Sequence, residues 1–492
     1  MSKETGVRSQ EAGGSWRAPP GLAVLVWLVV GLGLPGVASG QPSAHRLVDA
    51  VKQGDTGEVR RLVEVERLAV DSVDDTGATA LHWAAHQGED AVVAMLLGAG
   101  ASADTRTRYG VTPLALASAG GHADVVDALL VAGADPNLAS KDGETPLMVA
   151  ARTGVVGSVT SLLQHGADVA AREGWRGQTV VMWAAAENHA AIVAPLVAAG
   201  ADVDARSDEG FTPLAFAVRS GFTDTVEALL DVGADIEGAL PDGTSPLVIA
   251  VINAHYDVAV QLLERGADPN ASEQGWTALH QVVLTRRPNR HYNNPAAMPT
   301  GTVSDLVLVR ALVAHGADID ARLTAEPRNR YRNALNRKGA TPFLLATKAV
   351  DLELMQLLLD LGADPRVTNE DGTTPLLVAA GVGIWSSSEN PGSSEEALEA
   401  VKLMIELGDS VTTVDANGDA ALHGAVMRGS KELLQFLLEK GAALNPVNAQ
   451  GWTPLTISQG IFYANLGRRW PEMEAVLLEL GATSPTVPES PR

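Results

Sequence analysis

A short motif of the form Thr-Pro-Leu recurs along the chain, and this repetition constrains the fold more than any other feature. Eight of the ten steps between successive copies are 32 to 34 residues long. A unit of this length cannot bury its own apolar face, so neighbouring copies must stack into a solenoid. The eleven copies, numbered here in chain order, begin at Thr79, Thr112, Thr145, Thr179, Thr212, Ser245, Thr277, Thr341, Thr374, Ala420 and Thr453.

Each copy predicts two helices and a projecting turn, as the copy that begins at Thr112 illustrates. Thr112 can cap a helix, and Pro113 fits the first turn, where no backbone hydrogen bond is lost. A second helix buries the Leu pair at 129–130 and ends at Gly133 in a left-handed turn. The Asp-Gly pair at 142–143 then favours the turn of a hairpin that leads to the next copy. The predicted fold class is therefore all-α.

This unit resembles the ankyrin repeat, and the resemblance extends over residues 44–483. It implies an α-solenoid of stacked helix-turn-helix units with hairpin fingers, about eleven repeats in all. Residues 44–70 are polar and lack the Thr-Pro-Leu start, so we expect an N-terminal capping unit there. The repeat solenoid is predicted over 41–483, followed by a flexible tail over 484–492.

Residues 1–40 have the order of a secretory signal peptide. Lys3, Arg8 and Arg17 precede an uncharged apolar run at 21–34, and small residues before Gln41 suit cleavage. The run is shorter than the roughly 20 residues of a spanning helix, and an uncleaved membrane anchor is the alternative. Both interpretations place the rest of the chain outside the cytoplasm, in a periplasmic or secreted protein.

The composition excludes several classes of protein. The chain has no Cys, which rules out disulfides and thiolate metal sites, and its net charge of −23 argues against a nucleic-acid partner. Aromatic residues make up only 4% of the chain, whereas glycine occurs 49 times, which suits close helix packing with a turn glycine in most repeats. The Ala- and Gly-rich usage without Cys favours a bacterial origin.

Four segments interrupt the period of about 33 residues and are expected to form insertions. Those near 284–303, 381–396 and 459–469 fall between the two helices of copies 7, 9 and 11, whereas the one near 322–338 falls in a finger. Insertions in repeat proteins map to loops, often on a binding face. The three helix–helix insertions are expected to meet as one surface patch.

These insertions concentrate basic and aromatic side chains. Residues 285–338 carry ten Lys and Arg against four acids, although the whole chain has a net charge of −23. One interpretation is an Arg-rich patch that binds an anionic partner; the other is that the loops are solvated or that their aromatics pin them to the repeats. The patch comprises Arg286, Arg287, Arg290, Tyr292, Arg328, Arg330, Tyr331, Arg332, Trp385, Phe462, Tyr463 and Trp470.

A second candidate surface follows from the ankyrin resemblance, which implies that finger tips and first helices bind partners. Trp and Tyr are enriched among the residues that dominate interface energies, and packing hardly requires an aromatic at Trp175. The alternative for Phe211 and Trp276 is packing between fingers. The candidate surface comprises Arg106, Arg108, Tyr109, Lys141, Arg152, Trp175, Phe211, Arg219 and Trp276.

The sequence carries no catalytic or cofactor signature. His82 and His86 have the spacing of a metal pair, but Trp83 stands where a zinc protease requires Glu. Eight of the 11 His occupy repeat positions, and the resemblance implies that such side chains bond the backbone of neighbouring repeats. The acidic loop at 415–419 has its glycine misplaced for calcium and no closing Glu. We therefore expect no metal, no cofactor and no enzymatic activity.

The sequence predicts a monomeric, exported, non-enzymatic scaffold that binds an unidentified partner protein through its concave and insertion surfaces. The alternative is an exported recognition protein that captures an anionic ligand or polymer through residues 285–338. No nucleic-acid partner is expected. Membrane association is expected only if the N-terminal apolar segment is retained as an anchor.

Overall fold

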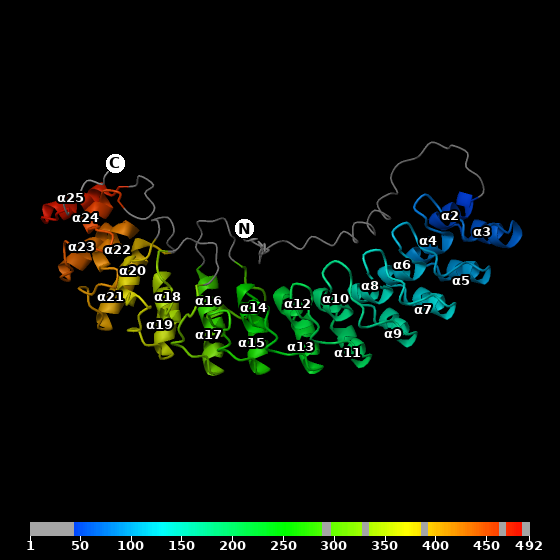
Figure 1. Ribbon diagram of the computed structural model, residues 1–492, viewed down its shortest axis with the longest axis horizontal. Coiled ribbons are helices and arrows are strands. Elements are labelled where there is room, and N and C mark those ends of the chain that lie inside the picture. Colours follow the sequence, from blue (N-terminus) through cyan, green and yellow to red (C-terminus); the bar gives the residue numbers. More distant parts are fainter. Residues whose placement is uncertain (1–43, 288–296, 327–333, 385–391, 462–468, 485–492) are drawn as a thin grey trace, which may run out of the picture. The chain divides into compact units, whose positions relative to one another are not determined.

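The computed structural model describes residues 44–287, 297–326, 334–384, 392–461 and 469–484. In this part of the chain the regular elements are helices, and the only strand-like pairs are two isolated bridges in fingers, Val73–Thr79 and Val414–Ala420. The chain divides into two compact units, Met1–Gly177 and Gln178–Arg492. The prediction of an all-α repeat fold is confirmed (Figure 1).

Each of the eleven copies forms a pair of helices, and within each unit the first helices of neighbouring copies pack on one another, as do the second helices (Figure 1). In the first unit the pairs are α4 (Ala80–Gln87) and α5 (Asp90–Gly98), α6 (Pro113–Gly120) and α7 (Ala123–Val131), and α8 (Pro146–Thr153) and α9 (Val156–Gln164). In the second unit the first helices are α10 (Val180–Ala186), α12 (Pro213–Ser220), α14 (Pro246–Ile252), α16 (Ala278–Arg286), α18 (Pro342–Lys348), α20 (Pro375–Ala380), α22 (Ala421–Arg428) and α24 (Pro454–Ser458). Its second helices are α11 (Ala190–Ala198), α13 (Thr223–Asp231), α15 (Tyr256–Glu264), α17 (Asp305–Ala314), α19 (Leu352–Asp360), α21 (Ser394–Glu406), α23 (Lys431–Glu439) and α25 (Pro471–Glu479).

Residues 44–65, where the sequence predicts a capping unit, form α2 (Ala44–Lys52), α3 (Thr56–Arg60) and a short π-helix at Arg61–Val65. Its exposed side carries ion pairs, with Arg46 at 2.9 Å from Glu66 and Arg61 at 2.6 Å from Glu58. Its other side buries Leu47, Val51 and Leu62. One polar and one apolar side are what the end of a repeat stack requires, because only one neighbouring repeat covers it.

The local rules read from the sequence operate as expected in copy 2. The Thr112 hydroxyl accepts a hydrogen bond from the Ala115 N–H at 3.2 Å, and Pro113 is the first residue of α6. Gly121 ends α6 with a φ of 70°, a left-handed conformation that costs glycine little. The Leu pair at 129–130 is buried between the helices. Capping and turn chemistry therefore set the bounds of α6 in this copy.

Buried histidines tie each of three copies to the following finger. His82 accepts the Thr79 N–H through Nδ1 at 3.1 Å, and its Nε2 lies 3.2 Å from the Val111 carbonyl oxygen. His280 and His423 make the same pair of contacts in copies 7 and 10. Because Nδ1 accepts a hydrogen bond, Nε2 carries the proton and donates it to the carbonyl. The expected backbone role of these histidines is confirmed, and both ring nitrogens of His82 are used by it.

A close approach between α20 and α22 depends on Gly424. A Cβ atom at this position would lie 2.6 Å from the Val382 nitrogen and 2.9 Å from the Ala380 carbonyl carbon. We expect Gly424→Ala to lower the free energy of unfolding by about 1–3 kcal/mol in urea denaturation, although Ala is the better helix former. Gly98→Ala is the matched control, because a Cβ there meets no atom within 4 Å. A similar loss in both variants would contradict the packing explanation.

No helix among residues 44–287, 297–326, 334–384, 392–461 and 469–484 has the length and apolar character to cross a bilayer.

Candidate functional site

In the first unit, backbone hydrogen bonds join the tips of successive fingers. The Lys141 N–H donates to the Tyr109 carbonyl at 3.2 Å, and the Gly174 N–H donates to the Asp142 carbonyl at 2.8 Å. A Cβ at Gly110 would lie 3.2 Å from the Lys141 nitrogen, so glycine permits this approach. We call the tips around Thr76, Tyr109, Asp142 and Trp175 the finger row. Its bonds hold the side chains of successive tips in a fixed register.

The finger row presents two large aromatic side chains to solvent. Tyr109 is 51% exposed and Trp175 is 49% exposed. The buried Glu173 carboxylate accepts the N–H groups of Trp175 and of Arg176, the latter at 2.8 Å, and so fixes this tip. The Arg176 guanidinium lies 4.2 Å from the centre of the Trp175 ring. The structure thus holds Trp175 outward on an ordered turn, which is the arrangement of an interface anchor.

Three basic residues of the candidate surface lie beside these aromatics. Arg106, Arg108 and Lys141 are all exposed. The Arg106 guanidinium donates to the carbonyl of Gly110 at 3.2 Å and to that of Ala139 in the next finger. Within the described residues, neither Arg108 nor Lys141 forms an ion pair with a carboxylate. The finger row therefore combines exposed aromatics with positive charge.

Arg152 lies away from the tips, half-buried on α8. Burial raises the pKa of the nearby Glu144 carboxyl, and the positive charge of Arg152 opposes that rise. Arg152 therefore interacts electrostatically with an acid of its own repeat, and it is less accessible than the residues of the finger row.

The candidate residues of the second unit are largely engaged by their own repeats. The Phe211 ring lies 5.5 Å from that of Phe216, and the Arg219 guanidinium lies 5.7 Å from the Phe211 ring centre. The Trp276 Nε1–H donates to Gln281 at 3.1 Å. All three candidates are only partly exposed. These contacts are made with the first helix of the same repeat, whereas the alternative interpretation for Phe211 and Trp276 supposed packing between fingers.

Arg286, which ends α16, is surrounded by carboxylates of its own chain. Its guanidinium lies 2.7 Å from Asp305 and 2.6 Å from Asp351, and it also bonds Glu353. Asp351 is only 1% exposed. Burial lowers the pKa of Arg286, but its bonds to Asp351 and Asp305 outweigh burial and raise it above the ordinary value. The side chain is a permanent cation with acidic partners on three sides.

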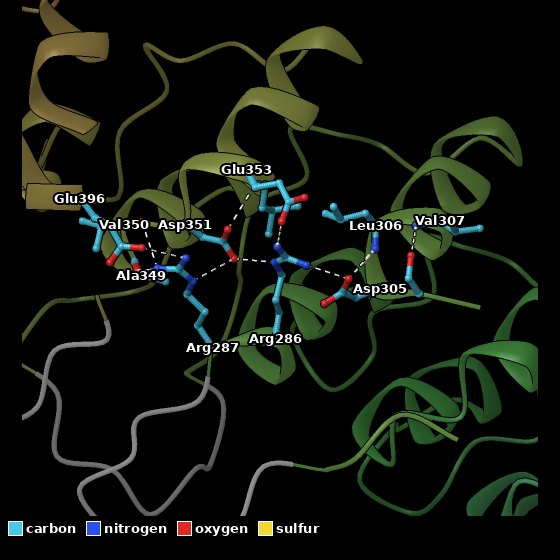
Figure 2. Close-up of polar contacts among 12 residues, drawn as sticks. Arg286, Arg287, Asp305, Leu306, Val307, Ala349, Val350, Asp351, Glu353 and Glu396 are labelled. Atoms are coloured by element: carbon cyan, nitrogen blue, oxygen red, sulfur yellow. Dashed lines mark hydrogen bonds and ion pairs between the residues drawn. The ribbon is translucent and has the colours of Figure 1, made fainter. Parts of the chain in front are cut away.

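Arg287 continues this network across copy 8 to copy 9. It lies 3.4 Å from Asp351 and 3.1 Å from Glu396, and it donates to the Val350 carbonyl at 3.2 Å. Val350 is fully buried with a φ of 45°, a strained conformation for a β-branched residue. Figure 2 shows Asp351 between the two guanidinium groups, with Glu396 on the far side of Arg287. The first and third insertions therefore meet at their described ends, over the copy between them.

These contacts correct the expectation for the Arg-rich patch at two of its residues. Arg286 and Arg287 were expected to offer positive charge to an anionic partner, but carboxylates of copies 7, 8 and 9 pair with both. Arg337 of the finger insertion is also buried and bonds Glu326 at 2.6 Å. The physical reason is that Arg286, Arg287 and Arg337 each meet acids that the fold brings to them, from later copies or from the same insertion.

The other described ends of the insertions also contact the repeats. Thr300 bonds His255 at 2.6 Å, and the Thr302 N–H donates to Asp257 at 3.0 Å, both on copy 6. The Trp470 indole approaches Gly429 of copy 10, and the Trp470 N–H donates to the Ser458 carbonyl at 2.9 Å. The remaining patch residues lie outside the described part of the chain: Arg290, Tyr292, Arg328, Arg330, Tyr331, Arg332, Trp385, Phe462 and Tyr463.

The finger insertion reaches the end of the first helix of copy 9. Leu335 is buried against Gly383, just after α20, where a Cβ would lie 2.5 Å from the Leu335 Cβ. The Lys348 ammonium at the end of α18 donates to the Gly383 carbonyl at 3.3 Å. The second insertion therefore joins the third, a contact that sequence spacing did not predict.

Two acids that organise these regions were missed by the sequence reasoning. Asp351 stands at the turn between two helices, and Glu173 precedes the extended finger tip. Asp351 lies 65 residues from Arg286 along the chain, so no local pattern connects them. Glu173 had a weak signal, because the 34-residue step between Thr145 and Thr179 adds one residue to this finger.

A family model described as ankyrin repeats in three copies matches residues 47–139, 92–173, 114–207, 171–239 and 393–460, and a single-repeat model matches 242–273. The chain belongs to the ankyrin repeat family. Ankyrin repeats generally mediate contacts between proteins. In the described part of this ankyrin repeat protein, no group of three or more His, Asp or Glu residues is arranged to hold a metal ion.

Two relatives illustrate how far the similarity extends. The human ankyrin repeat and SOCS box protein 16 is 36% identical over 228 residues, which is 37% of this chain and 50% of that protein. The probable 26S proteasome regulatory subunit p28 of Saccharomyces cerevisiae is 33% identical over 121 residues, or 24% of this chain and 47% of that protein. The chain thus spans about half the length of these relatives.

Proposed function

We propose that this ankyrin repeat protein is an exported, non-enzymatic scaffold that binds a partner protein through the finger row of its first unit. The observation that carries the proposal is the exposure of Tyr109 and Trp175 on finger tips that hydrogen bonds hold in register. Tyr and Trp give large contact areas with few rotatable bonds, so little conformational entropy is lost when they bind. The buried Glu173 supports this role by ordering the tip before a partner arrives.

The insertions support the first unit as the binding region. In copy 9, the chain's own finger insertion packs Leu335 against Gly383 just after α20, and this segment competes with any partner for the end of that helix. The pairing of Arg286 and Arg287 with acids argues against the alternative of an anionic ligand at 285–338. A partner that binds at the finger row meets neither the Leu335 segment nor guanidinium groups that are already paired with acids.

Export is part of the proposal and is supported by the residue order in the first 40 positions, from the basic start to the small residues before Gln41. The N-terminal sequence of the protein recovered from the extracytoplasmic fraction is expected to begin at Gln41. A chain recovered there with Met1 intact would instead favour the uncleaved anchor.

Alanine variants at the finger row test the binding proposal. Partners captured on the immobilised mature chain and identified by mass spectrometry are expected to bind Trp175→Ala and Tyr109→Ala at least about 30-fold more weakly, the effect of losing roughly 2 kcal/mol at an interface anchor. Val131→Ala is the control, because Val131 is 73% exposed at the end of the second helix α7. Unchanged affinity in both finger variants would reject the finger row as the binding surface.

A further inference from the structure

The finger row carries a regular line of positive charge. Arg108 and Lys141 occupy the same position in successive fingers, and each packs its stem over the glycine of the finger before it. A Cβ at Gly77 would lie 3.5 Å from the Arg108 Cγ, and one at Gly110 would lie 3.5 Å from the Lys141 Cγ. This packing fixes the stems and directs two cationic groups from the same face, one repeat apart.

The positive charge of Arg108 and Lys141 is not paired with carboxylates. Among the described residues these two side chains have no carboxylate partner, whereas Arg265, Arg286 and Arg287 each have at least one. Arg106 donates hydrogen bonds to carbonyl oxygens, which carry no net charge and so do not neutralise its guanidinium. The nearby Glu173 carboxylate is buried and accepts backbone N–H groups. The exposed acids of the tips are Asp142 and, in the first finger, Asp75, and neither pairs with Arg108 or Lys141 among the described residues.

We infer that the finger row recognises an acidic polypeptide segment that also carries a large apolar side chain. Its carboxylates pair with Arg108, Lys141 and Arg106, and its apolar side chain packs against Tyr109 or Trp175. This inference rests on the proposed function and specifies the chemistry of the partner at the same surface. Desolvated charge pairs next to aromatic anchors give both register and specificity to such an interface.

The charge of the whole molecule favours a short acidic segment over a long polyanion. The net charge of −23 repels an extended anionic polymer, whereas a short peptide senses only the tips, since charges beyond about 8–10 Å are screened in physiological salt. Asp71 and Asp75 are exposed in the first finger of the same unit, so a polyanion running along the row meets acids at its end.

A random 12-residue peptide display library selected on the immobilised mature chain tests this inference. We expect the selected peptides to be enriched in Asp and Glu together with apolar residues. Synthetic copies of the best peptides are expected to bind the Arg108→Glu/Lys141→Glu variant at least about 30-fold more weakly in fluorescence anisotropy, and to weaken further as salt is raised. Arg108→Gln/Lys141→Gln is expected to give a smaller loss. Arg310→Glu, an exposed change on α17, is the control and is expected to bind as the unaltered chain does.

The outcomes separate this inference from the proposed function. Peptides that lack acidic enrichment but depend on Trp175 would overturn the inference and leave the protein-binding role intact. Acidic peptides that bind the charge-reversed variant unchanged would also overturn the inference. If no peptide is enriched, or if none depends on Tyr109 or Trp175, the finger-row function fails as well. The binding of heparin and of duplex DNA is measured in parallel. If either binds more tightly than every selected peptide and this binding depends on Arg108, the inference of an acidic peptide is overturned in favour of a polyanion.

Discussion

Asp351→Ala is expected to lower the free energy of unfolding of copies 7 to 9 by about 3–5 kcal/mol, because it leaves two partly buried guanidinium groups without their shared acid. Asp351 is 1% exposed and lies within 3.4 Å of both Arg286 and Arg287. It also accepts the Leu354 N–H at 3.3 Å, so the change removes the N-terminal cap of α19. Arg286 keeps Asp305 and Glu353, which limits the loss but does not restore the centre of the network.

Urea denaturation together with hydrogen exchange resolved by segment measures this effect. In a repeat protein the loss should concentrate in the copies that share the network, with faster exchange in α18, α19 and α21. Glu399→Ala is the control, because Glu399 pairs with Lys402 in an exposed ion pair on α21 and should cost less than about 1 kcal/mol. If both variants lose the same small amount, the Asp351 network does not hold copies 7 to 9 together.

Stability is expected to fall steeply as the pH drops from 6.5 to 4. Burial lowers the pKa of His82, His280 and His423 from 6.5 to about 4, so the folded chain keeps them neutral while the unfolded chain protonates them. A folded pKa below the unfolded value gives stability that is fully present above pH 6.5 and is lost as the pH falls through 4. The shift corresponds to roughly 3 kcal/mol for each histidine.

His280→Gln provides the test within copy 7. The variant should be less stable than the parent at pH 7, because His280 bonds both Thr277 and the Ala340 carbonyl. Its stability should nevertheless change less between pH 7 and pH 4.5, since one buried titrating group is gone. Urea midpoints at the two pH values give this comparison. If the urea midpoint changes by the same amount between pH 7 and pH 4.5 in the variant and in the parent, His280 does not contribute to the acid sensitivity.

The features that sequence predicted are those set by neighbours within one repeat. The threonine cap at Thr112, the left-handed Gly133 with its φ of 93°, and the bridging role of His82 each depend on residues a few positions away or one period away. Residues one period apart occupy the same position in neighbouring copies. The fold and the register of the fingers therefore follow from the period. The same logic placed Tyr109 and Trp175 on exposed tips.

The features that sequence did not predict lie where the period is broken. Inside an insertion, position no longer indicates neighbours, and the Arg-rich composition of 285–338 does not reveal Asp351 or Glu396, which come from later copies. Leu335 meets Gly383 for the same reason, although the whole of copy 8 separates them in the chain. The net charge of a segment gives the number of charged side chains in it. Which acids pair with its arginines depends on the three-dimensional course of the chain, which only the structure shows.

Site-specific photo-crosslinking tests the binding role of the finger row most directly. A photoreactive benzoylphenylalanine in place of Trp175 is expected to give a covalent adduct with a partner protein in the extracytoplasmic extract, and the same group at Val131 is expected to give none. The adduct should disappear in the Arg108→Glu/Lys141→Glu background if the partner segment is acidic, and should persist if only the aromatic contact matters. Equal adducts at positions 175 and 131, or adducts at neither, would contradict a partner-binding role for the finger row.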